Sequence, residues 1–89
     1  MFDWDDENSD HVRRHGVEPE EVEEAVTDPR RLGVAAYNTA REVRRGMLGA
    51  TSAGRVLAVV LTRRAGRVRI ITARDADGAE KKRYRTRGK

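Results

Sequence analysis

An unbroken run of apolar residues at positions 56–61 (VLAVVL) restricts the possible folds of this chain more than any other segment. Successive side chains of a strand point to opposite faces, so a run that is apolar at every position needs cover on both faces. Turn signals bound the run, because SAG at 52–54 precedes it and AG at 65–66 follows its basic end. The sequence therefore predicts a central strand over residues 55–64.

Three further segments have the composition of strands. They are RLGVAAYN at 31–38, EVRRGMLGAT at 42–51 and RVRIITAR at 67–74. Thr39 and Ala40 give a turn signal between the first two of these segments. In the last segment, Val68 and Ile70 are expected to face the helices, and Arg69 is expected on the other face because side chains alternate along a strand.

The first third of the chain has helical spacing instead. Residues 18–27 combine a proline in the first turn, glutamates at the positive end of the helix dipole, and apolar residues at spacings of three and four. A shorter helix is expected over residues 7–14, with Gly16 as its C-terminal cap. Phe2 and Trp4 share one side of a short N-terminal strand.

The predicted order is a strand, two helices, three or four antiparallel strands and a C-terminal basic helix over residues 77–87. We therefore expect an α+β fold in which an antiparallel β-sheet packs against N-terminal helices. A chain of 89 residues is expected to form one domain that spans residues 1–89. Only 37% of the residues are hydrophobic, so the core is thin and a partner that covers apolar surface would stabilise it.

Charge is divided along the chain rather than mixed. Residues 1–28 carry 11 acidic and 2 basic side chains, a net charge of −9, whereas residues 29–89 carry 4 acidic and 17 basic side chains, a net charge of +13. The cations concentrate on the predicted strands, which favours a surface that binds nucleic acid or an acidic protein. The alternatives are arginines that only solubilise a small domain and glutamates that form a solvated helix face.

Several classes of site and location are excluded or disfavoured. The chain contains no cysteine, which excludes disulfides, cysteine zinc sites and thiol nucleophiles, and which fits a reducing cytoplasm. His11 and His15 are four residues apart, as a metal site on a helix requires, but spacing marks no third ligand, so we expect no metal or other cofactor. No apolar run approaches the roughly 18 residues of a membrane span, so none is expected.

A set of short motifs, in order along the chain, resembles one known family. The motifs are WD at Trp4 and Asp5, RHGV at 14–17 before a glutamate-rich helix, DP at Asp28 and Pro29, Glu42 with Arg44, SAGR at 52–55, RIITARDA at 69–76, and Glu80 with Tyr84. Together they resemble the BrnT family of type II toxins, which share the RelE-like ribonuclease fold. The resemblance implies a ribonuclease toxin that cleaves RNA to arrest growth and that a cognate antitoxin, usually of the ribbon-helix-helix type, neutralises in a hetero-oligomer.

The chemistry of such a ribonuclease selects candidate catalytic residues. Without a metal, the site must deprotonate a ribose 2′-hydroxyl, stabilise a doubly negative phosphorane and protonate the leaving 5′-oxygen. Arginine binds two phosphate oxygens with a planar fork, so Arg69 and Arg74 are predicted to clamp the phosphate, with Arg44 as a third cation. Histidine suits proton transfer, so His15 is predicted as an acid or base.

Other residues are predicted to bind the substrate. Tyr84 is expected to stack on a base or to bond the phosphate, with packing on the sheet as the alternative. The remaining cations, expected to attract the phosphate backbone, are Arg67, Lys81, Lys82 and Arg83.

The catalytic candidates and the function also have alternatives. Arg69 and Arg74 would instead form salt bridges to the acidic helix at 18–24, and His15 would bond the last carbonyls of its helix. The alternative functions are a non-catalytic module that binds nucleic acid or antitoxin, and a ParE-like toxin that acts on a protein target.

Overall fold

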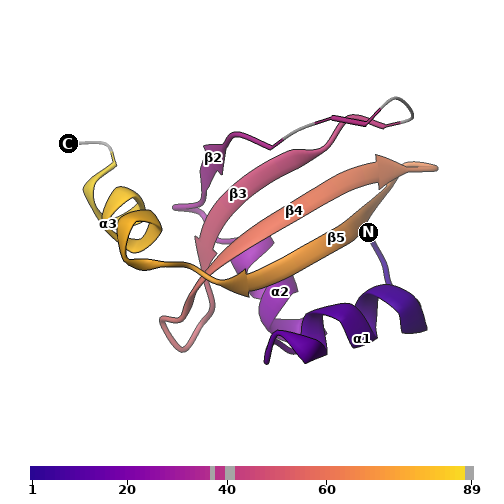
Figure 1. Cartoon of the computed structure of the whole chain (residues 1–89), viewed down its shortest axis with the longest axis horizontal. Coiled ribbons are helices and arrows are strands. Elements are labelled where there is room, and N and C mark those ends of the chain that lie inside the picture. The colour runs from indigo at the N-terminus through magenta and orange to yellow at the C-terminus, as the bar shows by residue number, and fades with distance from the viewer. Residues whose placement is uncertain (37, 40–41, 88–89) are drawn as a thin grey trace.

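The structure is a computed structural model that describes residues 1–36, 38–39 and 42–87. Its elements are β1 (Phe2–Asp3), α1 (Asp6–Arg14), α2 (Pro19–Val26), β2 (Leu32–Val34), β3 (Arg45–Ala50), β4 (Val56–Arg64), β5 (Arg67–Asp75) and α3 (Gly78–Thr86). The order of helices and strands up to β5 is the predicted one (Figure 1). Tyr37 and Ala40, expected in a strand and in the turn after it, lie outside the described residues.

The strands form one five-stranded sheet in the order β1-β5-β4-β3-β2. The central position of β4 confirms the prediction from its apolar run. The prediction of a purely antiparallel sheet is wrong at one edge, because β1 pairs with β5 in parallel, with Phe2 opposite Val68. No short turn joins β1 to β5, so the connection does not impose an antiparallel direction as it does in the hairpins.

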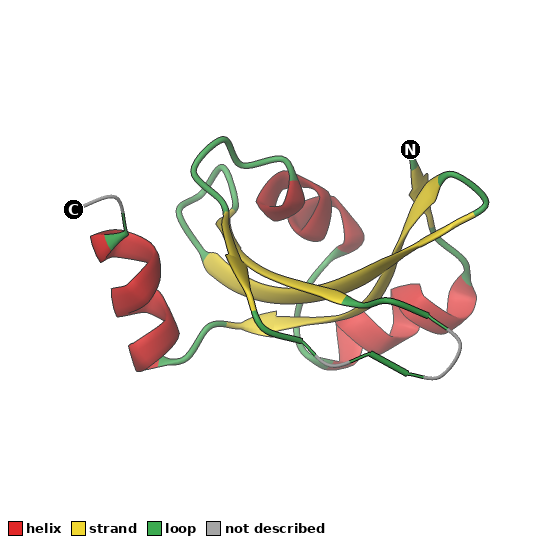
Figure 2. Ribbon diagram, turned by 90° about the horizontal axis from the view of Figure 1, so that it is seen from above, coloured by secondary structure: helices red, strands yellow, loops and turns green. Residues whose placement is uncertain are grey.

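The main core lies between the sheet and the two N-terminal helices. Helix α2 covers one face, whereas α1 runs along the β5 edge (Figures 1 and 2). Val12 and Val22 from the helices are fully buried against Leu57, Val59 and other strand residues. Val68 and Ile70 belong to this core, as predicted from the alternation along β5.

Two glycines are required by the fold, one for a close contact and one for its backbone conformation. An added Cβ at Gly49 in β3 would lie 2.0 Å from the carbonyl oxygen of Ala25, so α2 rests directly on the backbone of the strand. Gly16 has φ +77 after α1, and the N–H groups of Gly16 and Val17 donate to the carbonyls of Arg13 and Val12. This is the predicted glycine cap, in the form of a Schellman motif.

A smaller apolar cluster lies toward the end of the sheet that carries α3. It consists of Leu48, Val56 and Ala76, with Tyr84 of α3 packed against it. Helix α3 has no buried residue and projects from the end of the sheet (Figures 1 and 2). Among the described residues, none of the helices has the length and apolar character needed to cross a membrane.

Candidate RNA-binding site

Arg44, just before β3, lies where three hollows of the surface meet. Its side chain lines a hollow of about 880 Å³, a second of about 510 Å³ and a third of about 330 Å³. The Nε atom of Arg44 is 3.0 Å from Oε1 of Glu42, and the Arg44 side chain is 29% exposed. This predicted cation is therefore accessible from each hollow.

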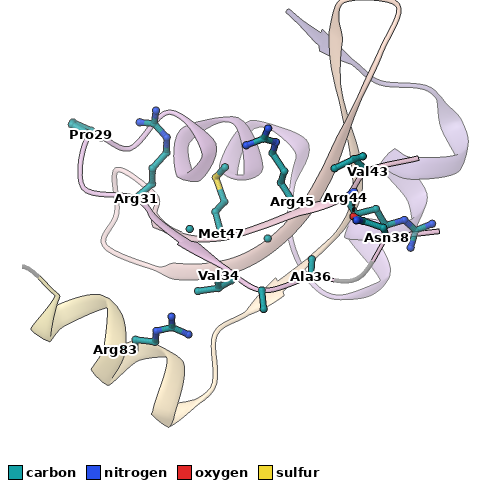
Figure 3. Close-up of a pocket in the computed structure, with 13 residues that line it drawn as sticks. Pro29, Arg31, Val34, Ala36, Asn38, Val43, Arg44, Arg45, Met47 and Arg83 are labelled. Carbon is teal, nitrogen blue, oxygen red and sulfur yellow. Dashed lines mark hydrogen bonds between the residues drawn. The ribbon is translucent and has the colours of Figure 1, made fainter. Parts of the chain in front are cut away.

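The largest hollow carries most of the surrounding positive charge. Arg31, Arg45 and Arg83 line it together with Arg44, and Met47 contributes an apolar wall. Figure 3 shows that these arginines come from different segments, with Arg83 reaching in from α3. Because four arginines line one open hollow, it suits a chain of phosphates.

The second hollow is mainly apolar. Ala35, Ala36, Val60 and Ile71 line it, and the polar side chains at its edge belong to Arg44 and Thr72. An apolar surface next to a guanidinium can receive the flat face of a base while the cation binds the adjoining phosphate.

Arg69 lies in the wall of the third hollow but is largely neutralised. Its side chain is only 9% exposed, and its guanidinium is 3.0 Å from Asp5, 3.6 Å from Asp3 and 3.6 Å from Glu7. The hydrogen bond to Asp5, followed by the charges of all three carboxylates, raises the pKa of Arg69. The expected alternative of a salt bridge to the helix at 18–24 is wrong, since the partners belong to β1, α1 and the link between them.

Arg74 is more exposed and is held by α3. Its guanidinium binds both carboxylate oxygens of Glu80, at 2.8 and 3.0 Å, and its side chain remains 48% exposed. Arg74 therefore pairs with α3, and not with the helix at 18–24 that the sequence suggested as an alternative. Among the cations that the structure describes, Arg55 binds that helix through Glu21 and Arg13 binds Glu18 at its start. Arg55 also binds Asp75.

The two histidines have different surroundings. His15 is exposed at the C-terminal cap of α1, where its backbone N–H, rather than its ring, donates to the carbonyl of Val12. His11 lines the third hollow, and its Nε2 is 3.1 Å from the hydroxyl of Thr72. The two rings contact edge to face, with centroids 5.1 Å apart. Sequence reasoning gave His11 no role in catalysis, although the spacing of four already placed it beside His15.

Tyr84 is half-buried and lines none of the three hollows that meet at Arg44. Its ring packs against the cluster of Leu48 and Val56, and its hydroxyl donates a short hydrogen bond to Asp28. Burial, followed by the hydrogen bond to Asp28, raises the pKa of Tyr84. This agrees with the packing alternative considered for Tyr84.

The remaining predicted cations are exposed. Arg67 lies at the start of β5, and Lys81, Lys82 and Arg83 lie on α3. Of these four, Arg83 lines the largest hollow together with Arg44. Sequence reasoning missed Arg31 and Arg45 in that hollow, because nothing local distinguishes them from other basic residues.

Much of the acidic N-terminal third has structural partners. Glu23 accepts a hydrogen bond from the Trp4 indole, and Glu24 accepts one from the backbone of Ser52.

Within residues 1–36, 38–39 and 42–87, no group of three His, Cys, Asp or Glu side chains is placed to hold a metal ion.

Comparison with known proteins agrees with the resemblance noted in the sequence. A family model for BrnT, the ribonuclease toxin of type II toxin-antitoxin systems, matches residues 4–80. A search of curated proteins gives no match. The matched stretch contains Arg44, Arg69 and Arg74 and ends before Tyr84. Because it covers most of the chain, the protein belongs to the BrnT family and is a ribonuclease toxin of a type II toxin-antitoxin system, with an antitoxin as partner and RNA as target.

Proposed function

We propose that this toxin is a metal-independent endoribonuclease with the RelE-like fold, built as one domain over residues 1–89. It acts in the cytoplasm, where cleavage of RNA arrests growth. Its antitoxin is of the ribbon-helix-helix type and neutralises it by forming a hetero-oligomer. The C-terminal basic helix adds sequence-independent attraction for RNA through Lys81, Lys82 and Arg83.

The position of Arg44 is the observation that carries the proposal. One guanidinium borders both a hollow rich in arginines and an apolar hollow. Single-stranded RNA presents the same two features side by side, since each phosphate adjoins a base with an apolar face. Arg44 binds the scissile phosphate, and a base lies against Val60 and Ile71.

The other proposed residues act around this phosphate. Arg74 turns from Glu80 toward the phosphate, which its exposure permits. Arg69 contributes positive charge from the wall of the third hollow, and Arg67 attracts the RNA chain. Tyr84 positions α3 and its cations, and its ring edge contacts the RNA. His15 supplies the proton for the leaving 5′-oxygen.

The proposal is tested by tightly induced expression in a bacterium, with growth and total RNA as readouts. Arg44→Ala should relieve growth arrest and RNA loss, because the central phosphate contact is removed. Arg13→Ala is the matched control, since Arg13 also binds a glutamate through Nε, at 3.1 Å, on the surface of α1. We expect Arg13→Ala to remain as toxic as the wild type.

Cleavage by the purified protein tests the chemistry directly. RNA should be cut in the presence of a chelator and should leave a 2′,3′-cyclic phosphate, whereas an oligonucleotide with 2′-deoxyribose should stay intact. Cleavage that stops with the chelator, or that also cuts DNA, would refute a metal-independent mechanism through the 2′-hydroxyl.

A further inference from the structure

The hydrogen bond between His11 and Thr72 joins two of the hollows that meet at Arg44. His11 lines the third hollow, and Thr72 lines the apolar one. The Nε2 atom of His11 and the hydroxyl oxygen of Thr72 are 3.1 Å apart, although the residues are separated by 61 positions in the sequence. Both hollows also share Arg44 and Ile71, so the pair lies beside the proposed phosphate site.

Attachment of α1 to the sheet does not depend on this pair. Asn8, one turn earlier, is buried and donates hydrogen bonds to the carbonyls of Asp3 and Ile70, at 3.0 and 3.2 Å. Val12, the neighbour of His11, is fully buried in the main core. His11 and Thr72, by contrast, are both partly exposed, as groups that meet a substrate must be.

The hollow that His11 lines is rich in charged side chains, and the His11 ring also contacts the ring of His15. The charged side chains that share its hollow are Glu7 and Arg14 of α1, Arg44, Arg64 of β4 and Arg69 of β5. Four of these five are cations, so this hollow attracts the phosphates of RNA to the pair. A neutral ring can accept a hydrogen bond from the Thr72 hydroxyl at Nε2. The oxygen of Thr72, which lines the apolar hollow, keeps its lone pairs for a second donor.

We propose that Thr72 and His11 form a proton relay that activates the ribose 2′-hydroxyl, an inference that rests on the proposed function. The 2′-hydroxyl gives its proton to the Thr72 oxygen while Thr72 gives its own to Nε2 of His11. The 2′-oxygen then bonds to phosphorus, and the bond from phosphorus to the 5′-oxygen breaks with its electron pair on that oxygen. The leaving 5′-oxygen takes a proton from His15.

Isosteric substitutions at Thr72 test the relay. Thr72→Val keeps the β-branched shape but removes the hydroxyl, and Thr72→Ser keeps the hydroxyl. Single-turnover cleavage of a mixed-sequence single-stranded RNA oligonucleotide is measured with the purified full chain. We expect Thr72→Val and His11→Gln each to lower the rate about 100-fold or more, and Thr72→Ser to stay within about tenfold of the wild type.

The double variant and the pH profile separate a relay from a structural contact. Because two members of one relay act as a unit, Thr72→Val with His11→Gln should be no slower than either single variant. Because His11 acts as a base and His15 as an acid, the wild-type rate should follow a bell-shaped pH profile, and His11→Gln should lose the limb in which the rate rises with pH. Thermal unfolding confirms that each variant is folded.

The failures of the two proposals are distinguishable. Wild-type protein that is folded but leaves RNA intact would overturn the proposed function and the relay with it. A wild type that cleaves RNA, with Thr72→Val and His11→Gln within about threefold of its rate, would overturn the relay alone. Equal losses for Thr72→Ser and Thr72→Val, with a lowered unfolding temperature, would show that the hydrogen bond is structural and would also overturn the relay.

Discussion

Arg74 and Glu80 form a bidentate ion pair that joins the end of β5 to the first turn of α3. The contact with Arg74 lowers the pKa of Glu80, and the contact with Glu80 raises the pKa of Arg74. Glu80 also accepts the backbone N–H of Asp77 and so completes the capping box of α3. One carboxylate thus caps the helix and occupies the nitrogens of Arg74 that a phosphate would bind.

Glu80→Gln should strengthen RNA binding. Glutamine can still accept the N–H of Asp77, so the capping box remains, whereas the charge that holds Arg74 is lost. We expect the dissociation constant for single-stranded RNA to fall several-fold at low salt, with a change in stability below about 1 kcal/mol. Glu20→Gln on α2 changes the net charge equally and is the control. An equal gain from both variants would show a general charge effect rather than release of Arg74.

Arg69→Ala should destabilise the fold. Removal of the guanidinium leaves the carboxylates of Asp3, Asp5 and Glu7 without the cation that they surround. We expect a loss of about 2 kcal/mol, or on the order of 10 °C in the unfolding temperature, measured by calorimetry. Arg67→Ala, on the same strand but exposed, should change the free energy of unfolding by less than about 0.5 kcal/mol. Unchanged stability in Arg69→Ala would contradict a structural role for this arginine.

Gly49→Ala should prevent α2 from docking on β3. The new Cβ would lie 2.0 Å from the Ala25 carbonyl oxygen, so the helix must move away from the sheet. We expect a destabilisation of about 3 kcal/mol, or failure to fold. Gly33→Ala is the matched control in β2, since an added Cβ there has no atom within 4 Å. Denaturant unfolding of both variants makes the comparison, and similar midpoints would refute the close approach.

The contact between Asp28 and Tyr84 should make stability depend on pH at both extremes. Burial raises the pKa of Asp28, but hydrogen bonds from Tyr84 and the backbone N–H groups of Ala50 and Arg30 outweigh it, so the net pKa is lowered. Its contribution is therefore present above about pH 4 and lost as pH falls through the lowered value. The pKa of Tyr84 is raised, so its contribution is present below about pH 10 and lost as pH rises through the raised value.

Tyr84→Phe tests this dependence. The variant should lose about 1 kcal/mol near neutral pH, because one hydrogen bond is removed. Its unfolding temperature should also decline less than that of the wild type above about pH 10, since the tyrosine hydroxyl no longer ionises. Parallel alkaline curves for the two proteins would contradict the raised pKa of Tyr84.

Local patterns in the sequence predicted most of the elements. The apolar run at 56–61 identified the central strand, and alternation along 67–74 placed Val68 and Ile70 in the core. Gly16 was correctly predicted to end α1. These predictions succeed because periodicity and caps depend on residues within a few positions of one another.

Predictions about partners were less accurate. The salt bridges suggested between Arg69 or Arg74 and the helix at 18–24 were wrong, because many carboxylates can pair with an arginine and only packing selects among them. The parallel direction of β1 was missed for a related reason, since no local turn specifies it.

The sequence by itself determined the order of the elements, the central strand, the separation of charge and the motifs of the family. Only the tertiary structure decided that Asp3, Asp5 and Glu7 surround Arg69, that three hollows meet at Arg44, and that His11 contacts Thr72. The physical reason is sequence distance. A contact across 61 residues depends on how α1 and the sheet pack, and no local periodicity records that packing.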